Sequence, residues 1–253
     1  MLRAAILVLA LWLAASAPPT APAPGAAPPP CVQQSFEGSR FWVCRYEPAT
    51  EELRLAAHDA AGRPLDSLPG LRAWLGPDAG RALFAMNAGM YEADQRPLGL
   101  FVASGREAQP LNRGSGGGNF YLAPNGVFWV GADGAPHVTE TGAYAAAPPA
   151  GVAWATQSGP LLVQGGAFNP HISADGASLN LRNAVGVRRG VAWFVISDDK
   201  VSFGRLARFL RDALGCPDAL YLDGAVSSLW APGQDRLDGR RGLGTFVVVL
   251  RRP

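Results

Sequence analysis

The chain has 253 residues, of which 48% are hydrophobic and 17% charged; this is the composition of a globular protein and excludes a disordered one. Its 22 Lys and Arg residues almost balance its 20 Asp and Glu residues, so we exclude a surface that binds nucleic acid across the whole protein and expect no nucleic-acid partner. The 31 glycines and 22 prolines exclude a helical bundle and predict many turns.

The N-terminus has the pattern of a secretory signal peptide over residues 1–17. Arg3 precedes an apolar run at 4–15 that is shorter than the ~20 residues of a membrane span. Small residues at its end suit cleavage, but Pro18 is a poor first residue of a mature chain, so an uncleaved N-terminal anchor is the alternative. We therefore expect a periplasmic or secreted protein, with no membrane contact beyond such an anchor.

Residues 18–30 contain seven prolines and form a predicted Pro/Ala-rich linker. No second segment of this kind follows, so we expect residues 31–253 to form one domain. Because export permits disulfides, we favour a Cys31–Cys44 bond that leaves Cys216 unpaired and buried. A Cys44–Cys216 bond is the alternative pairing.

The apolar runs of the domain predict an α+β fold with a mixed sheet, hairpins, one βαβ unit and few helices. Apolar residues at three- and four-residue spacing predict a helix over 203–214, which Gly215 would cap. A shorter helix is predicted over 67–75. Strands are predicted at 41–46, 53–57, 82–86, 98–103, 119–122, 127–130, 161–163, 191–196, 219–222 and 244–250.

The helix at 203–214 lies between the predicted strands 191–196 and 219–222, and these three elements form the predicted βαβ unit. Such a crossover is right-handed and makes its two strands parallel. Ser197 and Asp223 would then share the carboxyl-terminal edge of the sheet, where open α/β sheets bind their ligands.

Small and hydrogen-bonding residues gather beside several of these runs. Asn87 follows the strand at 82–86, and Gly89 permits a sharp turn after it. A glycine-rich loop at 114–118 precedes Asn119, and backbone N–H groups of such a loop can approach an anion. Each cluster also has an ordinary explanation as a turn or a helix cap without a ligand.

Two further clusters carry charge. Arg182, next to Asn183, could hold a phosphate or carboxylate through a bidentate fork. We group it with Gln157 and Ser158 as one wall of a cleft. Asp223 directly follows an apolar run, and desolvation at such a position shifts the pKa of a carboxyl group. The candidate residues that follow Asp223 are Gly224, Ser227 and Ser228.

Read in order, six segments resemble the phosphodiester glycosidase family, whose animal member is a lysosomal enzyme that removes N-acetylglucosamine from a phosphodiester on mannose. The segments cover most of residues 41–250, and the likeness is strongest to small exported bacterial members. They are AMNAGMY (85–91), PLGLFV (97–102), GNFYLAPNGVF (118–128), TQSGPLLV (156–163), RNAVGV (182–187) and ALYLDGAVSSL (219–229).

The resemblance implies an exported hydrolase that cleaves the glycosidic bond of a sugar-1-phosphodiester. By position it carries over Asn87 and Gly89, Arg182, and the Asp223, Gly224 and Ser228 of an Asp-Gly-x-x-Ser motif. We expect Asp223, Arg182 and Asn87 to be catalytic, with Arg182 neutralising the phosphate. We expect the substrate to be bound by Gly89, Asn119, Gln157, Ser158, Asn183, Gly224, Ser227 and Ser228.

Phosphate is already a good leaving group, so one carboxylate can suffice as nucleophile or base, and Asp223 is the candidate. Glu92 and Asp198 are the acids that could form the second member of a pair. We expect no cofactor or metal site; a divalent cation on Asp223 is the alternative, although no metal-spacing motif supports it. Ala225 and Val226 stand where many relatives have glycines, which leaves the substrate's shape open.

Two other functions compete with this interpretation. A non-catalytic carbohydrate or cell-wall binding module would use the same cleft and stack Tyr91, Phe120 and Trp230 on sugar faces. A serine or metal-dependent hydrolase is disfavoured, because the chain has no Gly-x-Ser-x-Gly elbow and three scattered histidines.

Overall fold

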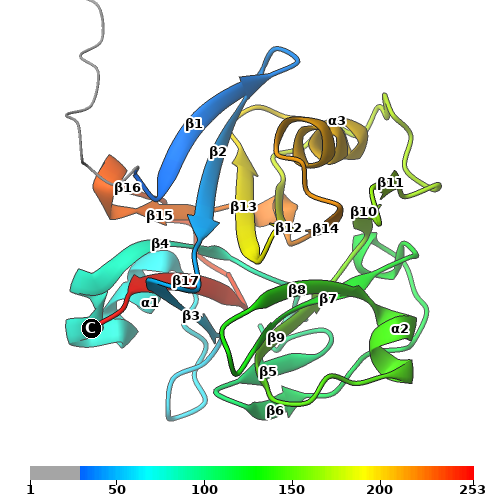
Figure 1. Cartoon of the computed structure of the whole chain (residues 1–253). Helices are drawn as coiled ribbons and strands as arrows, with labels where there is room; N and C mark the ends of the chain where they lie inside the picture. Colours follow the sequence, from blue (N-terminus) through cyan, green and yellow to red (C-terminus); the bar gives the residue numbers. More distant parts are fainter. Residues whose placement is uncertain (1–28) are drawn as a thin grey trace, which may run out of the picture.

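Three antiparallel sheets with few helices make up the protein in a computed structural model that describes residues 29–253 (Figure 1). The predicted signal peptide at 1–17 and residues 18–28 of the predicted linker lie outside the described residues. Within residues 29–253, no helix has both the length and the apolar character needed to cross a membrane.

The first sheet has seven strands and carries the disulfide. Cys31 of β1 faces Cys44 of β2 and is bonded to it, while Cys216 is buried and unpaired, as predicted. The strand order is β1 (Cys31–Phe36), β2 (Ser39–Tyr46), β13 (Val191–Ser197), β12 (Asn183–Arg188), β14 (Asp218–Tyr221), β10 (Leu161–Gln164) and β11 (Ala167–Phe168).

The second and third sheets have five strands each, and all their pairings are antiparallel. The second runs in the order β16 (Arg236–Leu237), β15 (Leu229–Ala231), β4 (Ala82–Asn87), β17 (Phe246–Arg251) and β3 (Glu51–Ala56). The third runs in the order β6 (Arg106–Gln109), β5 (Phe101–Ala103), β9 (Val152–Ser158), β7 (Gly126–Gly131) and β8 (Pro136–Glu140).

The two predicted helices are present. Helix α1 (Leu68–Leu75) begins at the cap Ser67, and α3 (Phe203–Arg208) begins at the cap Ser202; both hydroxyls accept a backbone N–H of the first turn. A π-helical turn over Phe209–Ala213 extends α3, which packs against the first sheet (Figure 1). A third helix, α2 (Thr141–Ala146), follows β8.

The main core lies where the three sheets meet. Phe194 of the first sheet contacts Phe84 of the second and Phe128 of the third, with ring centroids 5.6 and 5.5 Å apart. All three rings are at most 1% exposed. This shared core fixes the sheets relative to one another, so residues at strand ends in different sheets are held in constant positions.

The predicted βαβ unit does not form with adjacent strands, because β12 lies between β13 and β14 and is antiparallel to both. The strands β13 and β14 therefore run in the same direction as second neighbours. Asn183 at the start of β12 pairs with Ile196, and the next residue pairs with Tyr221, so the end of β14 and the start of β12 share one edge of the sheet.

Other segments also differ from the predicted elements. Residues 119–122 were expected as a strand, but Asn119–Tyr121 is a 3₁₀ turn. The glycines directly before Asn119 favour such a bend. The strand expected over 98–103 is confined to Phe101–Ala103. The strand β9, which contains Gln157 and Ser158, was not predicted because it has little alternation of apolar and polar residues.

Candidate active site

Asn87, at the end of β4, is hydrogen-bonded to segments at the edge of the first sheet where β14 ends and β12 begins. Its side-chain amide donates to the backbone oxygen of Asp223 at 2.6 Å, and its side-chain oxygen accepts the Ser228 N–H at 2.9 Å. Asn183 donates to both oxygens of Asn87, at 2.8 and 3.1 Å. Asn87 holds the 223–228 turn in place, and because it is fully buried its side chain is not exposed to a substrate.

Gly89 and Gly224 lie where neighbouring segments of the chain approach too closely for a larger side chain. A Cβ on Gly89 would overlap the Thr156 hydroxyl and lie 2.6 Å from the Gln157 carbonyl oxygen. A Cβ on Gly224 would overlap the hydroxyl of Tyr221. These glycines let the turn after β4 and the turn after β14 pack together, which brings Ala88 O within 3.0 Å of the Asp223 N–H.

Asp223 follows β14 and is only half-buried. Its carboxylate forms no hydrogen bond or ion pair with the residues that the structure describes. Burial raises the pKa of Asp223 to about 6, against the opposing attraction of Arg240. Asp223 is therefore a partly accessible acid whose charged form is not stabilised by a fixed partner.

Arg240 lies near enough to Asp223 for its charge to lower the pKa of that carboxyl, and the charge of Asp223 acts on Tyr91 in turn; sequence reasoning had not identified Arg240. Burial and the Asp223 charge raise the pKa of Tyr91 to about 12, while Arg240 opposes that rise. The Tyr91 hydroxyl donates to Gly242 O at 2.6 Å, which holds the loop between β16 and β17 against the 88–91 turn. Arg240 is exposed and takes part in no ion pair found within residues 29–253.

Arg182 does not have the surroundings expected of a phosphate ligand. It is 1% exposed, and its guanidinium donates to Val201 O at 2.8 Å and Ser178 O at 2.9 Å. The Phe203 ring covers it, with 3.7 Å between the guanidinium carbon and the ring centroid. Burial lowers the pKa of Arg182. The structure does not support direct contact with a substrate.

The contacts of Arg182 indicate that it stabilises the site from the protein interior. One guanidinium nitrogen lies 3.4 Å from the Tyr221 hydroxyl, which itself lies directly beneath Gly224. A cation buried at this depth without a carboxylate partner is costly unless its donors are occupied, and here two carbonyl oxygens and two hydroxyl oxygens accept from them. Arg182 is therefore a positioning residue for the turn that begins at Asp223.

Gln157 is likewise internal and 1% exposed. Its side-chain oxygen accepts from the Leu100 and Asn112 N–H groups at 3.0 and 2.9 Å, and its amide donates to Asn112 O and Thr141 Oγ1. The amide is fully used in joining the β4–β5 connection to β9. Packing leaves the polar atoms of Gln157 no accessible direction, so the structure does not support its expected contact with substrate.

Ser227 and Ser228 stabilise their own turn. Their hydroxyls donate to Gly224 O at 2.7 Å and to Val226 O at 3.0 Å. Ser158 and Asn183 are fully buried, and the Ser158 hydroxyl oxygen and the Asn183 side-chain oxygen are without a hydrogen-bond partner among the described residues. Both oxygens are buried, so neither lies on an accessible surface.

Asn119 is exposed, and its carbonyl oxygen would lie 3.2 Å from a Cβ on Gly159. The glycine-rich loop 114–118 that leads into it is also exposed. Asn119 therefore lies next to the residue that follows Ser158, and it stays a predicted substrate contact.

The expected second carboxylates are not paired with Asp223. Asp198 accepts from Gln33, Trp42 and Arg236 at 2.7, 3.0 and 3.0 Å, so both its oxygens are already bonded. Glu92 is exposed. No group of three or more His, Cys, Asp or Glu side chains within residues 29–253 is placed to hold a metal ion.

The aromatic residues of the competing binding-module hypothesis are mostly in the core. Phe120 and Trp230 are 2% and 4% exposed, so neither can stack on a sugar. Tyr91 alone of the three is half-buried. The hypothesis was wrong for these two rings, because Trp230 packs in the core between α1 and the second sheet, and Phe120 packs against Gly99 and Tyr121.

Comparison with known proteins identifies the class to which this fold and site belong. Residues 80–250 match the model of the phosphodiester glycosidase family, and the chain belongs to that family. The family is one of glycosidases, which are hydrolases. The matched residues contain Asn87, Gly89, Arg182 and Asp223, so the resemblance of the six segments is confirmed.

Individual relatives agree with this assignment. "Uncharacterized protein YigE" of Escherichia coli K12 is 34% identical over 187 residues, covering 74% of this chain and 72% of the relative. The catalytic domain of zebrafish N-acetylglucosamine-1-phosphodiester alpha-N-acetylglucosaminidase, auto-inhibited by its pro-peptide, matches with a TM-score of 0.59 and 14% identity over 88% of this chain and 82% of that one. A hypothetical Synechocystis protein matches with a TM-score of 0.52 and 17% identity, over 88% and 61%. These two structures show a shared fold.

Proposed function

We propose that the protein hydrolyses the anomeric C–O bond of a sugar-1-phosphodiester, with Asp223 as the catalytic carboxylate. The observation that supports this most is the environment of Asp223: a half-buried carboxyl with no fixed partner among residues 29–253, at the start of a turn that Asn87 holds in place. Structural carboxylates are ordinarily hydrogen-bonded or paired, whereas an unpaired, half-buried one with a raised pKa is suited to catalysis.

The proposed reaction breaks the bond between the anomeric carbon and the bridging phosphate oxygen, and the electron pair leaves with the phosphate. A water oxygen bonds to the anomeric carbon, and Asp223 accepts the water's proton. Alternatively Asp223 attacks first and forms a glycosyl ester; water then bonds to the anomeric carbon, the ester C–O bond breaks to return the Asp223 carboxylate, and the water's proton passes to solvent. Both routes require ionised Asp223, and neither needs an acid, because a phosphate monoester leaves without protonation.

The pH profile tests this use of Asp223. Because the pKa of Asp223 is raised to about 6, its carboxylate fraction falls tenfold for each pH unit below that value. We expect kcat/KM to rise with pH up to about 6 and then to level off. A profile that is flat between pH 4 and 7 would contradict a catalytic role for the carboxylate.

Arg240 is the residue proposed to take the phosphate, in place of the buried Arg182. It is an exposed cation whose charge reaches both Asp223 and Tyr91, and it has no ion-pair partner among the described residues. A guanidinium binds a phosphate oxygen pair through two N–H donors. Arg240 would therefore hold the leaving group beside the carboxylate that attacks.

Arg240→Gln should lower kcat/KM for a sugar-1-phosphodiester by about 10- to 100-fold, because one charge-assisted contact is lost. Arg241→Gln is a matched control: it removes the same charge one residue away, where the guanidinium pairs with Asp66 at 2.8 Å. Steady-state kinetics of both variants give the comparison. Equal losses in the two variants would remove Arg240 from the site.

A substrate panel tests the proposed activity itself. The purified protein is incubated with sugar-1-phosphodiesters that differ in sugar and alcohol, and mass spectrometry identifies released sugar and phosphomonoester. We expect turnover of at least one member. Tight binding across the panel without any product would instead favour the carbohydrate-binding function.

We further propose that the protein works outside the cytoplasm, in the periplasm or after secretion. The Cys31–Cys44 disulfide supports this, because such bonds persist in oxidising compartments. Cell fractionation checks it, and recovery of the protein in the cytoplasm with reduced cysteines would contradict it.

A further inference from the structure

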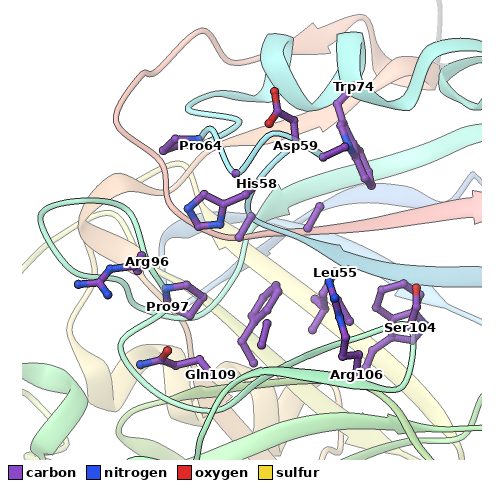
Figure 2. A pocket seen from close by; sticks show the side chains of 18 of the residues that line it. Leu55, His58, Asp59, Pro64, Trp74, Arg96, Pro97, Ser104, Arg106 and Gln109 are labelled. Atoms are coloured by element: carbon purple, nitrogen blue, oxygen red, sulfur yellow. The ribbon is translucent and has the colours of Figure 1, made fainter.

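A cleft with a volume of about 720 Å³ is lined by residues other than those of the candidate active site (Figure 2). Its upper wall is the connection from β3 to α1, which contains His58 and Asp59, and its lower wall is the β5–β6 hairpin, which contains Ser104 and Arg106. No residue predicted for catalysis or substrate binding lines it.

An exposed aromatic ring reaches toward this cleft. Trp74 of α1 is 41% exposed, although Leu68, Leu71 and Leu75 of the same helix are buried. Figure 2 shows the Trp74 side chain extending from α1 toward the hairpin that carries Arg106. A large ring left in water at the wall of a cleft gains free energy when an apolar face covers it, and the C–H face of a sugar ring is such a face.

The polar lining adds directional groups and positive charge. Asp59 is paired with Arg63 at 2.8 Å, and Asp94 with Arg96 at 2.6 Å, so these acids are neutralised. Arg106 takes part in no ion pair found within residues 29–253, so no fixed carboxylate among the described residues offsets its charge at the wall of the cleft. The lining also offers His58 and Gln109 for hydrogen bonds to hydroxyl groups.

One loop connects this cleft with the candidate active site. Tyr91 lies beside Asp223 and pairs with Pro97 in an isolated bridge, which closes the 91–97 loop. Pro97, together with Arg96, lines the cleft. A chain-like ligand that follows this loop could contact both places.

We propose that the cleft binds a neighbouring segment of an anionic glycan, specifically a polymer of sugar-1-phosphate units whose bond is cleaved at Asp223. Trp74 stacks on a sugar ring, and Arg106 binds a phosphate of the chain. The polymeric nature of the substrate rests on the proposed function, whereas binding in the cleft does not require turnover.

Binding is measured by calorimetry with a panel of sugar-1-phosphate polymers from bacterial capsules and with their neutral, dephosphorylated oligosaccharides. The protein carries Asp223→Asn so that the polymers stay intact. Trp74→Ala should weaken binding about tenfold, and Trp74→Phe should retain most of the affinity. Arg106→Gln should weaken binding of the charged polymers alone, whereas Arg189→Gln, outside the cleft, should leave it unchanged.

Hydrolysis of a short sugar-1-phosphodiester separates this proposal from the proposed activity. With Asp223 present, Trp74→Ala should cleave the short substrate at the wild-type rate and the polymer more slowly. Unchanged polymer affinity in both Trp74→Ala and Arg106→Gln, or no affinity for any polymer in the starting protein, would overturn the cleft proposal even if the short substrate is cleaved. Polymer affinity that depends on Trp74 without any turnover would uphold the cleft and reject the activity.

Discussion

Asp223→Asn should lower turnover of a sugar-1-phosphodiester by at least about 10³-fold and leave the fold intact. The substitution keeps the size of the side chain but removes the group that attacks or accepts the proton. Circular dichroism and steady-state kinetics measure the two effects. Asp212→Asn, which alters an exposed acid paired with Arg211, is the control and should turn over normally.

The same substitution should make the protein more stable at neutral pH. The folded pKa of Asp223 is about 6, above the ordinary value of 3.8, so the folded state binds the proton more tightly than the unfolded state. The contribution of Asp223 to the stability of the wild type therefore falls as pH rises from about 4 to 6, and burial of its charge costs about 1–3 kcal/mol above that range. Asn lacks this penalty.

Urea unfolding at pH 4 and pH 8 measures the difference between Asp223→Asn and the wild type. We expect little difference at pH 4 and greater stability of the variant at pH 8. A variant that is less stable at both pH values would mean that Asp223 has a structural partner, and the catalytic interpretation would lose its main support.

Asn87→Ala should have the second large effect, on both stability and turnover. It removes the acceptor of the Ser228 N–H and the donor to Asp223 O, and both of these backbone groups would be left without their partners. At about 1–3 kcal/mol for each unsatisfied buried group, we expect a loss of roughly 3 kcal/mol in the free energy of unfolding. Turnover should fall with it, because the turn at Asp223 loses its anchor.

Asn180→Ala is the matched control, since Asn180 is exposed and its side chain bonds only to the Ser178 hydroxyl, at 3.3 Å. Chemical denaturation and the kinetic assay are applied to both variants. If Asn87→Ala were as stable and as active as Asn180→Ala, the hydrogen bonds of Asn87 to the 223–228 turn would have no part in holding the site.

Local features of the sequence were sufficient to predict several elements. Ser67 and Ser202 are caps that precede apolar stripes, so both helices were predictable from neighbouring residues. The Cys31–Cys44 pairing was predictable because a short hairpin brings the two residues opposite each other. Asp223 at the end of an apolar run was likewise visible as a candidate.

Burial of polar side chains was beyond sequence reasoning, because it depends on which segments pack together. Arg182 and Gln157 have the residue types of a binding site, yet carbonyl and amide groups from other segments occupy their donors and acceptors. Arg240 carries no motif and reaches Asp223 only through the packing of its loop against Tyr91. The position of β12 between β13 and β14 also depends on distant pairing.

Hydrolysis in H₂¹⁸O tests the central claim most directly. A sugar-1-phosphodiester that the protein turns over is incubated in labelled water, and both products are analysed by mass spectrometry. Attack at the anomeric carbon puts ¹⁸O into the released sugar and none into the phosphomonoester, and this is the result we expect, with its rate abolished in Asp223→Asn. Label in the phosphate would show cleavage of the P–O bond and would contradict the account.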